Sequence, residues 1–326
     1  MKVISVTPAG RRQYLEILAS YLLRNRNLIH EHHWWLNTRN PEDVAYIHCL
    51  ADAHPDFFRV IAKPLDASVT LGGNIWNYLR DCTDPDTLYL RLDDDICYMT
   101  PNSIENFIRY RQARPEPFLV LGNIVNNAVC THFCQRAGIV PTTWGVVGNE
   151  CTDPVGHRNP RFTRRLHKLF LHDIEVGGQN RWKKVPFPID GTRRFSINAI
   201  SWYGVDLAGI PELHVDDIDE EPFLTVDLPT RLGRPNELCP GALFAHYAFY
   251  TQREYLERTS PDLLARYRAI AQSMRPGESR SSTGSMSLET LLWRVREVKW
   301  QARRIRRNPK RFVVDLIKGT RPTKAA

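Results

Sequence analysis

The sequence lacks the features that mark several classes of protein. No apolar run reaches the roughly 20 residues that a membrane-spanning helix needs. Residues 1–20 contain polar and charged interruptions where a secretory signal peptide needs a continuous apolar stretch. No large part of the chain has low complexity, so most of it is expected to fold. We therefore expect a cytoplasmic protein whose 326 residues form one large domain or two smaller ones.

The cysteines lack a pattern that would predict disulfide bonds. There are seven, an odd number, and their spacing is irregular, which favours reduced thiols over a disulfide framework. Cys130, Cys134 and Cys151 lie near one another in sequence, but their spacing fits no common zinc finger or ribbon. The pattern therefore does not favour structural zinc.

Glycine is scarce where a nucleotidyltransferase would need it. Residues 2–7 are a β-branched run that predicts a first strand, stopped by Pro8 and Gly10. The turn Pro8-Ala9-Gly10-Arg11-Arg12 contains a single glycine, whereas a nucleotidyltransferase usually has a glycine-rich basic loop at this point. The single glycine weakens the hypothesis that the chain is a nucleotidyltransferase acting on sugar phosphates, without removing it.

Net charge is almost absent from the greater part of the chain. Residues 288–326 contain twelve Lys and Arg against three Asp and Glu, a net charge of +9, whereas the whole chain carries +8. Residues 1–287 therefore sum to about −1. Residues 275–287 are rich in serine and glycine, which predicts a flexible linker. We predict a folded domain over 1–274, a linker over 275–287 and a basic tail over 288–326.

The basic tail is predicted to be an amphipathic helix that binds an anionic membrane surface. Apolar residues recur at helical spacing between arginines, with Trp293 and Trp300 on a different face. A second apolar patch covers residues 312–317. Basic amphipathic helices with interfacial tryptophan lie on membranes, here on the inner face. Nucleic-acid binding and packing on a partner subunit are alternatives, but paired apolar patches favour the membrane over nucleic acid.

Strand and helix patterns alternate along the first half of the chain. Strands are expected over 2–7, 33–37, 57–61, 88–92 and 118–121, and helices over 14–22, 41–50, 73–79 and 102–111. This alternation predicts an α/β fold, with a mostly parallel sheet and helices on both faces. Ligands bind such sheets beyond the carboxyl ends of the strands. Thr7, Thr38 and Asn40 are expected at that edge.

Three consecutive aspartates, Asp93, Asp94 and Asp95, directly follow the fourth predicted strand. Because side chains alternate along an extended chain, Asp93 and Asp95 point to one side and Asp94 to the other. Two carboxylates this close repel unless a cation lies between them. Asp93 and Asp95 are therefore candidate ligands of a divalent cation, and Asp94 serves the turn or faces a nucleotide. The alternative is a solvated acidic turn ahead of a helix that Thr100-Pro101 opens.

These features resemble the GT-A fold nucleotide-diphospho-sugar glycosyltransferases over about residues 1–255. The resemblance rests on Val6-Thr7-Pro8, on Asn37-Thr38-Arg39-Asn40, on Asn74 and Asn77, and on the Asp-x-Asp that ends the fourth strand. It implies that residues 1–125 bind the nucleotide and that residues 126–274 bind the acceptor. The nucleotide-binding residues it implies are Thr7, Thr38, Asn40, Asn74, Asp93 and Asp94. It also implies that Asp93 and Asp95 hold Mn²⁺ or Mg²⁺ on the two phosphates of a UDP-, GDP- or dTDP-linked sugar.

An acidic cluster at residues 216–221 follows a strand predicted over 195–202. In inverting members of the family that the chain resembles, a carboxylate at this point is the general base, which must reach the acceptor hydroxyl. The resemblance implies this role for Glu220, ahead of Asp217, Asp219 and Glu221. The alternative is an acidic helix N-terminus favoured by the helix dipole. A retaining mechanism is the better interpretation if no carboxylate of the cluster lies near the acceptor.

His246 lies in the apolar, aromatic segment 241–250. Many GT-A enzymes use a histidine in a late strand as a further metal ligand, and neutral imidazole suits Mn²⁺. A histidine buried in the core is the alternative. The function implied is hexosyl or deoxyhexosyl transfer to a glycan or lipid-linked acceptor. A basic-tailed, non-enzymatic protein that binds membranes or nucleic acid is the remaining alternative.

Overall fold

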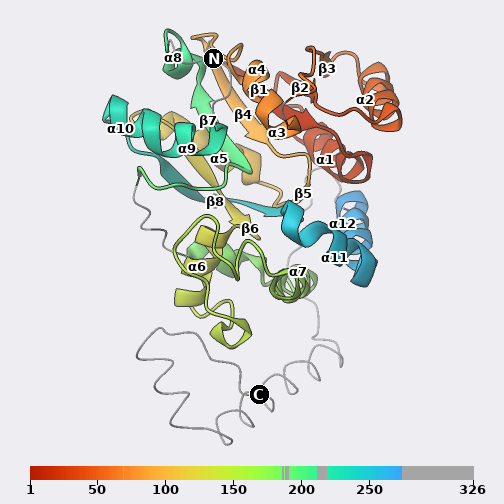
Figure 1. The fold of residues 1–326 in the computed structure, drawn as a ribbon, viewed down its shortest axis with the longest axis vertical. Helices are drawn as coiled ribbons and strands as arrows, with labels where there is room; N and C mark the ends of the chain where they lie inside the picture. Colours follow the sequence, from red (N-terminus) through yellow and green to blue (C-terminus); the bar gives the residue numbers. More distant parts are fainter. Residues whose placement is uncertain (69, 186, 188–190, 211–218, 274–326) are drawn as a thin grey trace, which may run out of the picture.

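The protein is an α/β structure built on one eight-stranded sheet (Figure 1). The computed structural model describes residues 1–68, 70–185, 187, 191–210 and 219–273. The predicted linker 275–287, the predicted tail 288–326 and Asp217 lie outside the described residues. Within the described ranges, none of the helices is both long and apolar enough to span a bilayer.

The sheet has a parallel half and a mixed half. The parallel half, in the order β3-β2-β1-β4, consists of β1 (Lys2–Ala9), β2 (Glu31–Leu36), β3 (Phe58–Ile61) and β4 (Thr87–Leu92). The mixed half continues from β4 with β7 (Ala199–Tyr203), β6 (Val120–Val125), β8 (Glu237–His246) and β5 (Ile96–Met99). β6 and β8 are parallel, whereas β7 is antiparallel to both of its neighbours and β5 is antiparallel to β8. The predicted α/β class with a mostly parallel, Rossmann-like sheet is confirmed.

Helices pack against this sheet. The longer ones are α1 (Arg12–Arg24), α2 (Pro41–Ala53), α5 (Ser103–Ala113), α6 (Ala128–Arg136), α7 (Pro160–Glu175), α11 (Tyr250–Thr259) and α12 (Pro261–Ser273). Shorter ones are α3 (Leu71–Asn74), α4 (Trp76–Leu79), α8 (Gly204–Leu207), α9 (Glu220–Pro222) and α10 (Leu228–Leu232). α1 packs on α2 and α12, and α5 packs on β6, β7 and β8. Every residue of β4 and β6 is buried, and since side chains alternate between faces, both faces of these strands are covered.

Three local expectations differ from the structure. The helix predicted over 73–79 is two four-residue helices, α3 and α4; glycines at positions 72 and 73 weaken a longer helix. The strand predicted from residue 195 begins at Ala199; ahead of it, Ser196 O and the Asn198 side chain bind the Asn127 amide. β5 was not expected, because its four residues are all buried and show no alternation.

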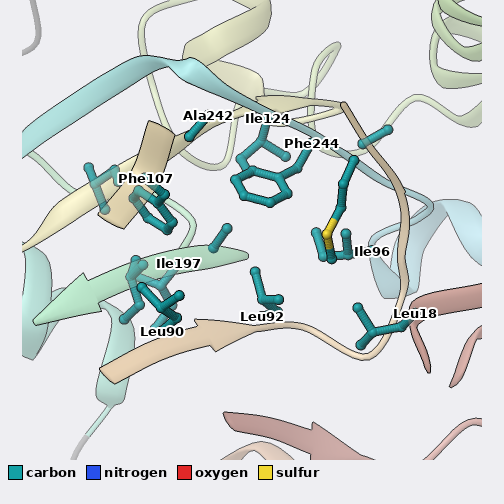
Figure 2. Close-up of a cluster of buried hydrophobic side chains, with 14 of the residues drawn as sticks. Leu18, Leu90, Leu92, Ile96, Phe107, Ile124, Ile197, Ala242 and Phe244 are labelled. Atoms are coloured by element: carbon teal, nitrogen blue, oxygen red, sulfur yellow. The ribbon is translucent and has the colours of Figure 1, made fainter. Parts of the chain in front are cut away.

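An apolar cluster fixes the carboxyl end of β4. In Figure 2, Leu90 and Leu92 of β4 lie across from Ile124 of β6 and Phe244 of β8, and Ile96 of β5 lies at one end. Leu90, Leu92 and Ile96 are fully closed to solvent. Packing of this kind leaves little freedom to the backbone on either side of it. The turn formed by residues 93–95 is therefore held between two well-packed strands.

A buried arginine holds the end of α5 against the loop that follows it. The Arg111 side chain is fully buried and forms an ion pair of 2.7 Å with Asp206. It also donates to the carbonyl oxygens of Arg114 and Pro117 at 3.1 and 2.8 Å. Its guanidinium carbon lies 4.5 Å from the centre of the Tyr203 ring. This network joins α5 to α8 and to the loop that leads into β6.

Replacing this arginine should therefore destabilise the protein strongly. For Arg111→Ala we expect the free energy of unfolding to fall by about 3–5 kcal/mol, because a buried carboxylate loses a partner and several carbonyl groups lose their donor. Urea denaturation measures the change. Arg109→Ala, on the same helix but with a 75% exposed side chain, should cost less than about 0.5 kcal/mol. Equal effects of the two substitutions would show that the network contributes nothing.

Candidate metal centre

The turn between β4 and β5 brings the aspartates beside the end of β8. Asp93 N donates to Asn198 O at 2.9 Å, and Ile96 N donates to Asp93 O at 3.2 Å. Ile96, the first residue of β5, then pairs with His246, the last residue of β8. Tyr247 N donates to Asp95 O at 2.9 Å. Residues more than 150 positions apart in sequence thus meet because β5 returns along β8.

Asp93, Asp95 and His246 form one cluster. Each offers a ligand atom, and these three atoms all lie within 4.8 Å of one another. His246 Nε2 is 3.2 Å from Asp95 Oδ1. Asp95 and His246 are buried, and the Asp93 side chain is 23% exposed, so the cluster is open to solvent on the side of Asp93. The predicted ligand set is brought together.

The chemistry of these atoms fits a divalent cation. His246 Nδ1 lies 3.4 Å from the carbonyl oxygen of Asn126. A hydrogen on Nδ1 can be donated to this oxygen; in that tautomer a neutral ring turns the Nε2 lone pair toward Asp95 Oδ1, whereas a protonated ring forms an ion pair with it. Oδ1 is closed to solvent and has no hydrogen-bond partner among the described residues. Two facing acceptors of this kind need a proton or a metal ion between them, and Mn²⁺ and Mg²⁺ both bind carboxylates.

Asn126 holds its carbonyl oxygen toward His246 through an unusual backbone conformation. Its φ is +68°, and no other residue except glycine has a positive φ in the described ranges. Its side-chain amide donates to Tyr247 O and to Gln252 Oε1, both at 3.0 Å. These bonds stabilise a conformation that asparagine tolerates better than most residues. Asn126 is thus positioned to orient the candidate histidine ligand.

Asp94 is turned away from the cluster, as predicted from the alternation of side chains. Its Oδ2 accepts from Gly10 N at 3.2 Å and from Arg11 Nε at 3.0 Å, and its Oδ1 pairs with Arg11 Nη2. Gly10 must remain small, because a Cβ there would lie 2.8 Å from Asn37 O. Asp94 therefore ties the turn after β4 to the turn after β1, and so brings the carboxyl ends of these two strands together.

Basic residues control the charge of Asp95. Arg11 Nη1 and Arg253 Nη2 lie 3.2 and 3.3 Å from Asp95 Oδ2. Burial by itself would raise the pKa of Asp95, but Arg11, His246 and Arg253 outweigh it and hold the pKa below its ordinary value. Burial raises the pKa of Asp94 in spite of Arg11, with help from the charges of Asp95 and Asp93. The pKa values of these two adjacent, buried carboxyl groups are therefore shifted in opposite directions, and Asp95 is held in its ionised form.

Glu220 is linked to the cluster through Arg91. Arg91 Nη1 pairs with Glu220 Oε1, and Arg91 Nη2 lies 3.3 Å from Asp93 Oδ1. Asn198 Nδ2 donates to the other oxygen of Asp93 at 3.0 Å. Burial raises the pKa of Glu220 to about 7, although Arg91 opposes the shift and Asp93 adds to it. A carboxylate with this pKa takes and releases a proton near neutral pH.

The other members of the acidic cluster point elsewhere. Glu221 Oε1 accepts from Arg194 Nε at 2.6 Å and from Cys151 Sγ at 3.2 Å. The Asp219 side chain is 70% exposed and lies 3.9 Å from Arg194. Asp217 is outside the described residues. Among the described members of the acidic cluster, Glu220 is the one that a single arginine, Arg91, joins to a predicted metal ligand.

The predicted nucleotide-binding residues outside the aspartate triplet take part in local structure. Thr7 is fully buried. Thr38 Oγ1 accepts from Asn40 N at 3.1 Å, and Asn40 Oδ1 caps α2 by accepting from Glu42 N at 2.9 Å. The Asn74 amide binds backbone atoms of Asp66 and Thr70. Their role toward a nucleotide stays a prediction.

Several residues around the cluster were not singled out from the sequence. They are Arg11, Arg91, Asn126, Asn198 and Arg253. Arg91 carried a signal, because a charged residue inside an otherwise apolar buried strand needs a buried partner. Arg253 and Asn126 carried none, since their approach to Asp95 and His246 depends on where α11 begins and where β6 ends in the folded protein.

Comparisons with known proteins give no family. No protein-family model matches the sequence, and no curated protein matches it. Solved structures do match it. One is a CMP:2-keto-3-deoxy-manno-octonic acid synthetase complexed with CTP, at 12% identity and a TM-score of 0.42, covering 84% of this chain and 100% of that chain.

Two further solved structures match at similarly low sequence identity and TM-score. The 4-diphosphocytidyl-2C-methyl-D-erythritol synthase of Anaerococcus prevotii has 10% identity and a TM-score of 0.40, with 83% and 96% of the two chains covered. The glucosyl-3-phosphoglycerate synthase of Mycobacterium tuberculosis, in complex with Mn²⁺, UDP-glucose and phosphoglyceric acid, has 13% identity and a TM-score of 0.35, with 85% and 82% covered. At these scores the likeness carries no inference about what this chain binds.

Proposed function

We propose that this protein is a metal-dependent glycosyltransferase that moves a sugar from a nucleotide-diphosphate donor to a glycan or lipid-linked acceptor. The observation that carries the proposal is the cluster of Asp93, Asp95 and His246 at the carboxyl end of β4. Donor phosphates bind at this edge of an α/β sheet, where loops and helix starts surround them. The predicted basic tail is kept in the proposal as the segment that brings the enzyme to a membrane-bound acceptor.

In this proposal one group of residues binds the metal ion and another residue accepts the proton of the acceptor. Asp93, Asp95 and His246 would hold Mn²⁺ or Mg²⁺, which supplies Lewis-acid stabilisation to the charge on the departing diphosphate. Glu220 would accept the proton of the acceptor hydroxyl as that oxygen attacks the anomeric carbon with inversion. Its link to Asp93 through Arg91 supports this choice of base over Glu221, which pairs with Arg194. Asn198 would orient Asp93 through its 3.0 Å hydrogen bond.

The test is release of nucleoside diphosphate from a panel of UDP-, GDP- and dTDP-linked sugars. The full chain is incubated with each donor, with and without Mn²⁺, and water serves as a slow acceptor until a sugar acceptor is found. We expect at least one donor to yield nucleoside diphosphate only when Mn²⁺ is present. Calorimetry under the same conditions reports donor binding independently of turnover. Absence of metal-dependent binding for every donor would refute the proposal, and pyrophosphate formed from a nucleoside triphosphate and a sugar phosphate would point to a nucleotidyltransferase.

A further inference from the structure

Two arginines converge on a single oxygen of Asp95. Arg11 Nη1 and Arg253 Nη2 lie 3.2 and 3.3 Å from Oδ2, while Oδ1 faces His246. Their side chains are partly exposed, at 31% and 27%. One oxygen of the carboxylate, Oδ1, thus faces the candidate metal site, and the other, Oδ2, faces the two arginines. Two guanidinium groups that share one oxygen repel each other. A further negative charge beside them would stabilise this arrangement.

Arg253 also has a nitrogen without a hydrogen-bond partner. Arg253 Nη2 additionally contacts Ala248 O at 3.0 Å, but Arg253 Nε is closed to solvent and has no hydrogen-bond partner in the described part of the chain. A phosphate would therefore meet the exposed part of the guanidinium group, whose side chain is 27% open to solvent, and a phosphate oxygen is a strong acceptor for such a donor. Arginine also matches phosphate in geometry, since its planar fork donates two parallel bonds.

Both arginines lie at helix N-termini that contain no acidic residue. Arg11 directly precedes α1, which has 13 residues, and Arg253 is in the first turn of α11, which has 10. The first turns of these helices have no Asp or Glu, and Arg11 makes no side-chain cap. The N-terminus of α1 already binds a carboxylate, since Arg12 N donates to Asp43 Oδ1 at 3.0 Å. The positive end of the α11 dipole adds to the two guanidinium charges.

The three aspartates of the turn are matched by three arginines before any ligand is added, and Glu220 shares Arg91 with Asp93. Asp93, Asp94 and Asp95 are each paired with at least one of three arginines, Arg11, Arg91 and Arg253. A divalent cation would add two positive charges to this neutral set, and a diphosphate would offset them. The arginines near Asp95 should therefore weaken the binding of a cation by itself and strengthen the binding of an anion beside it.

We propose that Arg11 and Arg253 form a binding site for the diphosphate group of the ligand, and that they make the binding of divalent cation and diphosphate mutually dependent. The inference rests on the proposed function for the identity of that ligand as a nucleotide-linked diphosphate. The site itself is defined by the two arginines and takes any diphosphate. Inorganic pyrophosphate and UDP are therefore both suitable probes.

The experiment is calorimetry on the full chain with Mn²⁺ alone, and with UDP or pyrophosphate in the presence of Mn²⁺, corrected for complexes formed in solution. In Arg253→Gln we expect affinity for UDP and for pyrophosphate to fall by about ten- to a hundredfold, because charge-assisted bonds to phosphate are lost. Affinity for Mn²⁺ alone should rise by about threefold, because a nearby positive charge is gone. Arg253→Lys, which keeps the charge, should lose phosphate affinity without this gain.

The matched control is Arg258→Gln. Arg258 lies on the same helix, its side chain is 70% exposed, and its contact is the neighbouring Glu254 at 3.7 Å. We expect it to change neither affinity by more than about twofold. If Arg253→Gln changed diphosphate affinity no more than Arg258→Gln does, the phosphate site would be refuted. If it weakened Mn²⁺ binding, Arg253 would be positioning Asp95 instead of competing with the metal.

Failure of this inference is distinguishable from failure of the proposed function. Metal-dependent binding of UDP that is indifferent to Arg253 would leave the glycosyltransferase proposal intact and remove the arginine site. Binding of pyrophosphate that depends on Arg253, with no binding of any nucleotide sugar, would leave the arginine site and remove the glycosyltransferase.

Discussion

Asp95→Asn should reduce affinity for Mn²⁺ by at least about a hundredfold, since loss of a residue that merely orients a ligand already costs ten- to a hundredfold. The substitution removes the negative charge that faces His246 Nε2 and leaves Arg11 and Arg253 without a shared carboxylate. Asp93→Asn should also lower the affinity for Mn²⁺. Calorimetric titration of Mn²⁺ into the full chain, with and without UDP, measures both effects.

Asp94→Asn is the matched control within the triplet. Asp94 carries the same charge one residue away, but its oxygens bind Gly10 and Arg11 instead of facing the cluster. We expect Asp94→Asn to change Mn²⁺ affinity by less than about threefold while lowering thermal stability, because a buried ion pair loses one partner. If Asp94→Asn removed Mn²⁺ binding as completely as Asp95→Asn, the assignment of ligands within the triplet would be wrong. If none of the three substitutions changed it, the turn would be an acidic turn without a metal.

The division of the triplet was predictable because it follows from the geometry of one short segment. Alternation along an extended chain singled out Asp93 and Asp95 as the pair, and the turn that residues 93–95 form keeps these two together. The α/β class was predictable for a similar reason, since strand and helix periodicities are read within windows of a few residues. The position of β4 in the middle of the sheet agrees with its unbroken burial.

The residues that contact the aspartate triplet were harder to predict, because they belong to helices and strands far from it in sequence. Arg253 reaches Asp95 only because α11 begins where β8 ends, and Arg91 meets Glu220 across 129 positions of sequence. β5 was missed because a fully buried four-residue strand has no alternation. His246 was singled out through a family resemblance, since a single histidine in an apolar strand has no periodicity of its own.

Glu220→Gln should lower transferase activity by about a hundred- to ten-thousandfold, the range that a general base contributes. It should leave Mn²⁺ affinity within about threefold, because Glu220 contacts Arg91 and not the metal cluster itself. In the wild type, kcat/KM should rise with pH up to about 7 and then level off, because the base acts only when deprotonated and its pKa is raised by burial to about 7. That rise should be absent from the residual activity of Glu220→Gln. Glu221→Gln, which loses a bond to Arg194 instead, should keep both the rise and most of the rate.

Stability gives an independent measure of the same pKa. Because the pKa of Glu220 is higher in the folded protein, about 7, than its ordinary 4.5, the folded state binds this proton more tightly than the unfolded state does. The stabilisation from this proton is complete below about pH 4.5 and is lost as pH rises through about 7. Glu220→Gln lacks that loss, so between pH 5 and pH 8 its stability should improve relative to the wild type by up to about 3 kcal/mol. Arg91 keeps Asp93 as a partner in Glu220→Gln, so a gain in relative stability would show that the cost of burying the Glu220 charge exceeds the benefit of its ion pair with Arg91. A loss of stability at every pH would show that the ion pair is the larger effect.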